Sequence, residues 1–114
     1  MTIPDIIKDL VDCGAMEGFK FYTTENGWFI EDSSGDPMLD VYTGRIAERI
    51  AEAEAARWLA RDGYKPTIIA DEHCGWSALI PHPNAVADTL TPQRATLLHA
   101  LHAAIVTVME GSKA

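Results

Sequence analysis

The sequence has few of the residues from which catalytic, metal-binding and disulfide motifs are built. Its 114 residues include only two cysteines, Cys13 and Cys74, which form neither a CxxC pair nor a disulfide framework, so free thiols are expected. It contains no phosphate-binding loop, HExxH pair or GxSxG nucleophile motif. No catalytic constellation is visible, and no cofactor is expected.

Basic residues are also scarce, with 9 Lys and Arg against 17 Asp and Glu, a net charge of −8. This balance disfavours direct contact with nucleic acids or anionic membranes. It favours a protein partner with a basic surface, although an acidic surface can also serve solubility alone.

Long hydrophobic runs are missing as well. Asp5 and Asp9 interrupt the apolar stretch Ile3–Val11, and no run approaches membrane-spanning length. We therefore expect a cytoplasmic protein with no membrane contact. With 47% hydrophobic and 23% charged residues, residues 1–114 are long enough to form one globular domain.

The N-terminal part predicts a short helix followed by a strand meander. Thr2 and Asp5 resemble a capping box for a helix over 2–13, which Gly14 can end. Antiparallel strands are predicted over 19–24, 28–32 and 38–42, with Asn26-Gly27 as a strong hairpin signal. The acidic residues of this meander are the main candidates for binding a partner: Glu25, Glu31, Asp32, Asp36 and Asp40.

A second helix is predicted over Arg45–Asp62, with Thr43 as its cap and Gly63 just beyond its end. One apolar side should carry Ala47, Ala51, Ala55 and Trp58, extended by Ile46 and Ile50.

The C-terminal part predicts strands over 67–70 and 76–80, a weaker strand over 86–90, and a closing helix. This helix should run over Thr91–Glu110, capped by Thr91 with Pro92 in its first position. Its stripe is so apolar that burial on more than one side is expected: Leu98, Leu101, Ile105 and Val108.

A shift of 48 residues aligns the two halves of the chain without a gap. Gly27-Trp28 falls on Gly75-Trp76, and Thr43 falls on Thr91. The halves, 19–64 and 67–112, would each be a ββ(β)α unit, either a true duplication or a chance likeness between similar units. The predicted fold class is α+β: a mainly antiparallel sheet with three helices on one or both faces, in the order α-β-β-β-α-β-β-(β)-α.

The densest group of potential ligands is Asp71, Glu72, His73 and Cys74, with His82 nearby. These residues could bind a metal or activate the thiol of Cys74. Because neighbours in an extended segment point to opposite sides, an acidic hairpin turn is the simpler interpretation. His99 and His102 could be metal co-ligands but lack a third, so partly buried histidines bonded to backbone or water are favoured.

Trp28 and Trp76 each follow a turn glycine and are candidates for either core residues or interface anchors. The two Gly-Trp strand starts and the run 87–92 before an alanine- and leucine-rich helix resemble small phage and prophage proteins of the "ABA sandwich" type. That family has no settled activity, so the resemblance implies only a phage or bacterial setting.

The sequence favours a small acidic binding protein that acts by stoichiometric protein–protein contact, as an anti-CRISPR-like inhibitor or nucleic-acid mimic would. The alternatives are an antitoxin or immunity protein, a metal- or thiol-dependent enzyme around His73 and Cys74, and a structural homodimer. The homodimer would pack through the 92–109 helix, at Leu97, Leu101 and Ile105.

Overall fold

The computed structural model of this chain describes residues 2–32, 40–61, 67–71, 75–80, 89–91 and 94–112. The fold class is α+β, as predicted, and the order of the elements agrees with the prediction. The elements are α1 (Ile3–Asp12), β1 (Phe19–Thr24), β2 (Gly27–Asp32), β3 (Asp40–Tyr42), α2 (Gly44–Arg61), β4 (Thr67–Asp71), β5 (Gly75–Ile80), β6 (Thr89–Leu90) and α3 (Leu97–Ser112).

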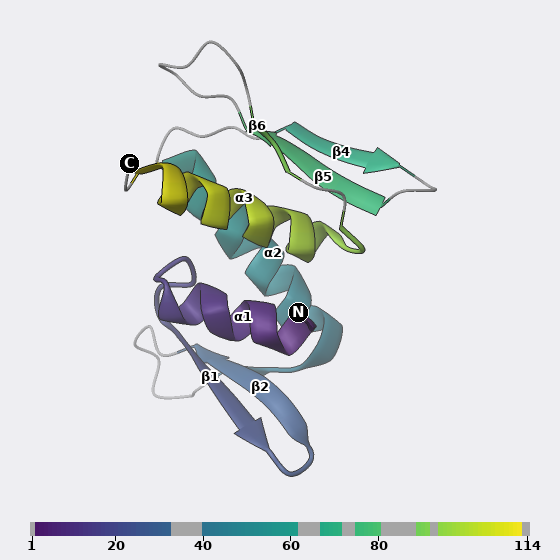
Figure 1. The fold of residues 1–114 in the computed structure, drawn as a ribbon. Coiled ribbons are helices and arrows are strands. Elements are labelled where there is room, and N and C mark those ends of the chain that lie inside the picture. The colour runs from purple at the N-terminus through teal and green to yellow at the C-terminus, as the bar shows by residue number, and fades with distance from the viewer. Residues whose placement is uncertain are drawn as a thin grey trace.

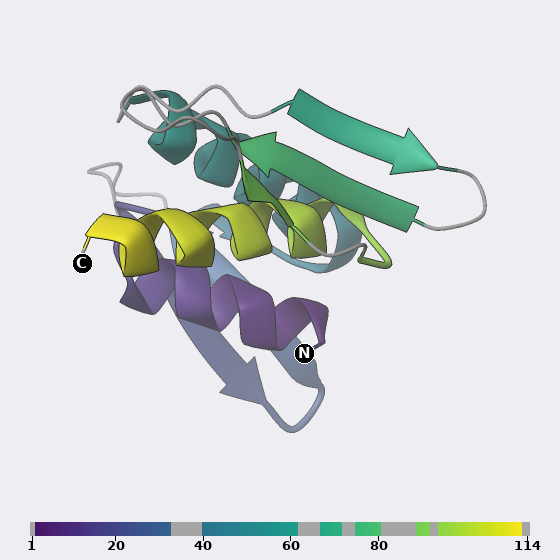
Figure 2. The ribbon, with the colours of Figure 1, turned by 45° about the horizontal axis from the view of Figure 1, so that its top comes forward.

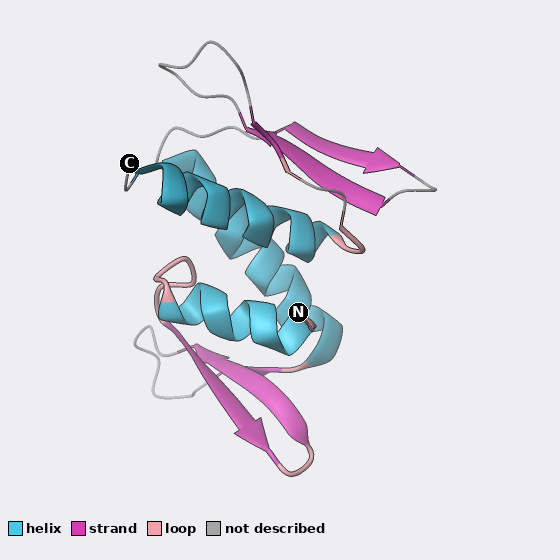
Figure 3. Ribbon diagram, in the orientation of Figure 1, coloured by secondary structure: helices cyan, strands magenta, loops and turns pink. Residues whose placement is uncertain are grey.

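The strands form two separate antiparallel sheets, β1-β2-β3 and β4-β5-β6, where the sequence predicted one. The sheets lie at opposite ends of the molecule with the helices between them (Figures 1 and 2). Figure 3, which is coloured by secondary structure, shows the helices as a central layer and the strands as two outer layers. Each sheet has an apolar inner face, and the shared helical layer covers both of these faces, so the sheets need not join.

Helix α1 begins and ends as predicted from local signals. The hydroxyl of Thr2 accepts the backbone N–H of Asp5, and the carboxylate of Asp5 accepts the backbone N–H of Thr2, which completes the capping box. Gly14 follows the helix with φ +88°, the left-handed conformation expected at a helix end.

The first hairpin is confirmed, but its turn is one residue earlier than the Asn26-Gly27 signal suggested. Thr24 pairs with Gly27, so Glu25 and Asn26 form the two-residue loop. The Thr24 hydroxyl accepts the Asn26 backbone N–H at 3.2 Å and lies 3.4 Å from the Gly27 carbonyl oxygen, to which it donates. This side chain therefore stabilises the turn.

Helix α2 buries a narrow stripe of mostly small residues: Ala47, Ala51, Ala55 and Leu59. The prediction that Ile46 extends this side is wrong, because Ile46 is 63% exposed. It lies about 100° around the helix from Ala47, on the side away from the stripe.

Helix α3 begins at Leu97, not near Thr91. The Thr91 hydroxyl accepts the backbone N–H of Ala78 in β5 at 2.8 Å, and the Thr91 N–H donates to the Ala78 carbonyl at 2.9 Å. Arg94 pairs with Trp76, so Thr91 and Arg94 are both hydrogen-bonded to β5. The residue that caps α3 is Thr96, whose hydroxyl accepts the N–H of His99. Pro92 lies outside the described residues.

One hydrophobic core joins the three helices to both sheets. Helix α3 packs against α2 and β5, and α1 packs against α2, α3 and β1. The fully buried side chains with the largest volumes come from both halves of the chain: Ile6, Ile7, Leu10, Met16, Ile30, Leu59, Ile80, Leu98 and Ile105.

The two halves share the ββ(β)α architecture, and the 48-residue shift places β2 on β5 with identical bounds. Their neighbouring strands differ by one residue in register: Thr24 pairs with Gly27, whereas Asp71 pairs with Gly75. A one-residue change of register exchanges the faces of a strand. An evolutionary duplication stays a prediction.

Candidate interaction surface

The outer face of the β1-β2-β3 sheet carries an exposed apolar group. Tyr22 pairs directly with Phe29, and their rings stack with centroids 5.1 Å apart and planes inclined by 22°. Tyr22 is 38% exposed, and Val41 of β3, on the same face, is 53% exposed. We call Tyr22, Phe29 and Val41 the aromatic patch.

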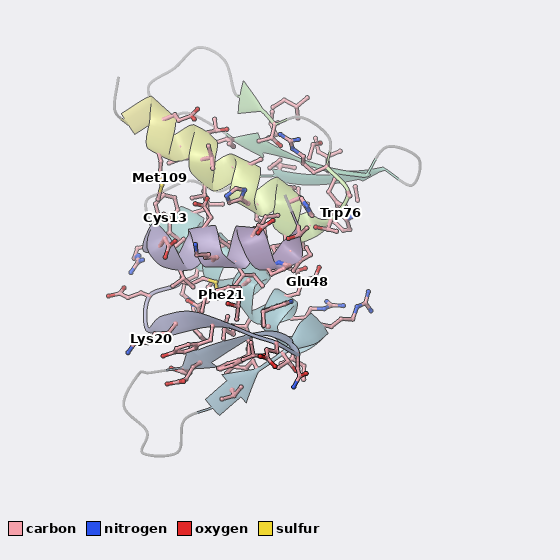
Figure 4. The ribbon with its side chains drawn as sticks, turned by 60° about the horizontal axis from the view of Figure 1, so that its bottom comes forward. Cys13, Lys20, Phe21, Glu48, Trp76 and Met109 are labelled. Atoms are coloured by element: carbon pink, nitrogen blue, oxygen red, sulfur yellow. The ribbon has the colours of Figure 1, made fainter. Side chains whose placement is uncertain are left out.

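The alternation of side chains along the strands produces this patch. Phe21 and Ile30 point inward and pack against the core, so their strand neighbours Tyr22 and Phe29 must point outward. Figure 4 shows the same division in β1, where Lys20 points away from the molecule and Phe21 lies on the side of α1. Both faces of the sheet are therefore apolar near its centre, and only one is covered by helices.

The acidic candidates of the meander do not gather at one point. Glu25 is exposed in the hairpin loop, and Glu31 lies on the outer face between Lys20 and Val41. Glu25 is at the hairpin turn, whereas Glu31 lies four residues along β2 from Gly27, about 13 Å in an extended strand. Asp32 is on the inner-facing side of β2, at its end, with the backbone of Asp40 opposite. Asp36 lies outside the described residues.

Trp28 packs into the molecule from the inner face of its sheet. Its ring stacks on Phe21, with centroids 5.9 Å apart, and it contacts the core. This position fits the role of a core residue better than that of an interface anchor.

Trp76 occupies the equivalent position in β5 and, like Trp28, is partly buried. It lines a cavity of about 360 Å³ together with residues 95–97 and four charged residues of α2: Arg45, Glu48, Arg49 and Glu52. Figure 4 shows Trp76 and Glu48 at the same end of the molecule. Burial raises the pKa of Glu52 above its ordinary value of 4.5, with nearby Arg49 opposing the rise.

Most of the predicted metal or thiol group cannot be placed. Glu72, His73, Cys74 and His82 lie outside the described residues, and Asp71 is described only as the end of β4. Within the described part of the chain, no three His, Cys, Asp or Glu residues are grouped to hold a metal ion. Cys13 is a free, exposed thiol, as predicted.

His99 and His102 are partly buried, as predicted, and each has a side-chain partner. His102 Nε2 lies 2.6 Å from Asp9 Oδ2 in α1, and His99 Nδ1 lies 2.5 Å from Thr96 Oγ1. Sequence analysis missed the Asp9–His102 pair because the two residues are 93 positions apart and no local pattern relates them. The aromatic patch did have a signal, since Tyr22 and Phe29 alternate with inward-facing apolar residues.

The proposed homodimer surface on α3 is already used within the chain. Leu101 is 3% exposed and Ile105 is 1% exposed, and Leu97 packs against the same core. A second copy that bound these residues would have to displace α1, α2 or β5.

No described helix is both long and apolar enough to cross a membrane.

Comparisons with protein-family models, curated proteins and solved structures found no match. The resemblance to phage and prophage proteins therefore stays a prediction.

Proposed function

We propose that this protein acts by stoichiometric contact with a second protein, which docks on the aromatic patch. The observation that carries the proposal is the stacked Tyr22–Phe29 pair beside the exposed Val41, on the face of the sheet opposite the helices. Contiguous apolar side chains on a surface are typical of interaction sites, and aromatic residues are enriched at the centres of interfaces.

The charges around the patch favour a partner with a basic surface. Lys20 is the one basic residue that the structure describes in this sheet and its hairpin turn, whereas Glu25, Glu31 and Asp32 are acidic. The whole chain carries a net charge of −8. Complementary charge of this kind speeds association and suppresses wrong partners, while the apolar centre supplies affinity.

An inhibitor of a basic, nucleic-acid-handling protein is the form of this activity that we favour, acting in the cytoplasm of a bacterial or phage-infected cell. The wide spacing of Glu25 and Glu31 supports a partner with a few basic side chains around an apolar recess. A partner that reads a continuous row of phosphates would need closer carboxylates.

The test is an affinity capture with matched variants. Wild-type protein, the double variant Tyr22→Thr/Val41→Thr and the control Ile69→Thr are immobilised, and lysate of the source organism is passed over each at low salt. Ile69 is a suitable control because it is 42% exposed in the other sheet. We expect wild type and Ile69→Thr to retain one basic protein in stoichiometric yield. The double variant should lose it, and about 0.5 M NaCl should elute it by screening the charges.

Circular dichroism of the three proteins controls for folding. Equal capture of the same protein by a folded double variant would contradict the role of the patch. If the captured protein stayed bound at high salt, the expectation of a partner with a basic surface would be contradicted.

A further inference from the structure

A cavity of about 270 Å³ lies between α1 and α3, separate from the aromatic patch. Its wall includes three apolar side chains, Ile6, Ala103 and Val106. Its polar lining includes three residues with basic side chains, Arg94, His99 and His102. Among the residues that the structure describes, neither Asp nor Glu lines it. This is unusual in a chain where acidic residues outnumber Lys and Arg by 17 to 9.

Each basic residue is held by a contact outside the cavity. The backbone of Arg94 is paired with Trp76 of β5 by two hydrogen bonds of 2.7 Å, which fixes the start of its side chain. His102 is oriented by Asp9, and His99 by Thr96, the residue that caps α3. The two imidazoles therefore line the cavity with limited freedom and lose little conformational entropy on binding, while the backbone pairing of Arg94 fixes where its side chain begins.

From this arrangement we infer that the cavity binds a small organic carboxylate with an apolar body. The guanidinium of Arg94 matches a carboxylate through two parallel N–H···O hydrogen bonds. Ile6, Ala103 and Val106 then cover the apolar body of the ligand, and the volume limits it to about one aromatic ring or a short branched chain.

Asp9 of α1 brings a negative charge close to the cavity, because it contacts the lining residue His102. Asp9 Oδ2 lies 2.6 Å from His102 Nε2, so the carboxylate of Asp9 is paired with the imidazole of His102. The adjacent acidic residues of α1, Asp5 and Asp12, flank a different hollow together with Lys8. The carboxylate specificity therefore depends chiefly on Arg94.

The test uses three probes of nearly the same shape: benzoate, neutral benzamide and cationic benzamidine. Each is titrated into ¹⁵N-labelled protein at neutral pH, and backbone amide shifts are followed by NMR. We expect benzoate to shift the amides of Ala103 and Val106 and to bind about tenfold more tightly than benzamide, a difference of ~1.4 kcal/mol. Benzamidine should bind more weakly than either.

Two variants separate the charge from the shape of the site. Arg94→Gln should lower benzoate affinity to the level of benzamide, whereas Arg57→Gln, on α2 and outside the cavity lining, should leave it unchanged. Val106→Phe should fill the cavity and weaken benzoate and benzamide together.

Equal affinity for benzoate and benzamide, or shifts confined to other parts of the chain, would overturn the inference. So would the absence of binding at about 10 mM, a concentration that saturates a site with a Kd of about 1 mM. Because none of these measurements involves the aromatic patch, they fail or succeed independently of the proposed protein partner.

Discussion

Gly27 and Gly75 occupy equivalent positions in the two halves of the chain, each as the first residue of a strand. Both have positive φ, +136° and +92°, so both disfavour a side chain. Their surroundings differ. A Cβ on Gly27 would meet nothing within 4 Å, whereas a Cβ on Gly75 would lie 2.2 Å from the carbonyl oxygen of Arg94. Gly75 is therefore needed for the close approach of two backbone segments.

We expect Gly75→Ala to lower the free energy of unfolding more than Gly27→Ala does. Both variants carry backbone strain, but Gly75→Ala must also displace Arg94 and break its two hydrogen bonds to Trp76. At about 1 kcal/mol for each hydrogen bond, the additional loss is ~2 kcal/mol. Urea denaturation of the two variants measures the difference, and equal losses would contradict the crowding at Gly75.

At the scale of single elements, α1 shows how a helix end becomes sensitive to pH. The pKa of Asp5 is lowered from its ordinary value of 3.8, chiefly by the hydrogen bond from the Thr2 side chain and then by that from the Thr2 backbone. A carboxylate with a depressed pKa contributes stability above the unfolded value. This contribution is lost as the pH falls through the folded pKa.

Asp5→Asn should therefore destabilise the protein at pH 7, and the difference from wild type should vanish in acid, below pH 3.8. The free energy of unfolding from urea titrations across this range tests the expectation. Asp12→Asn is the control, because a carboxylate at the C-terminal end of the same helix opposes the helix dipole and its loss should not destabilise. A constant difference between wild type and Asp5→Asn at all pH values would count against the capping charge.

At the scale of the whole molecule, α3 lies in the helical layer between the sheets, on the side of β5. Its apolar stripe, which would otherwise suggest an oligomer, is satisfied within one chain by α1, α2 and β5. The arrangement is elongated, with principal extents of 48, 32 and 20 Å, because the sheets lie at opposite ends. Their outer faces are left for interactions.

Leu101→Glu should therefore abolish cooperative folding rather than yield folded monomers. Leu101 is 3% exposed, and an unpaired carboxylate there would lack both water and a partner. Thermal unfolding by circular dichroism and mass by light scattering test this, with Leu90→Glu as the control at a side chain that is 59% exposed. A folded Leu101→Glu monomer beside a dimeric wild type would restore the homodimer hypothesis.

Features with local causes could be predicted from the amino-acid sequence. The capping box of α1, the hairpin near Gly27, the small-residue stripe of α2 and the α+β order all depend on neighbouring residues. The strands that carry the aromatic patch were predicted, but the patch itself was not, because the sequence alone does not say which face of the sheet the helices cover.

Features that depend on distant partners became visible only in the folded structure. Thr91 has the sequence of a helix cap, yet its hydrogen bonds to Ala78 of β5 hold it in extended form, so α3 begins six residues later. The separation into two sheets follows from a helical layer that can cover two apolar faces at once. The cavity beside α3 likewise has walls from α1 and from residues 94–107, and the Asp9–His102 contact joins these two parts of the chain across 93 positions. Local propensity could not predict these features, because each hydrogen bond or apolar contact is made with a segment that only folding brings near.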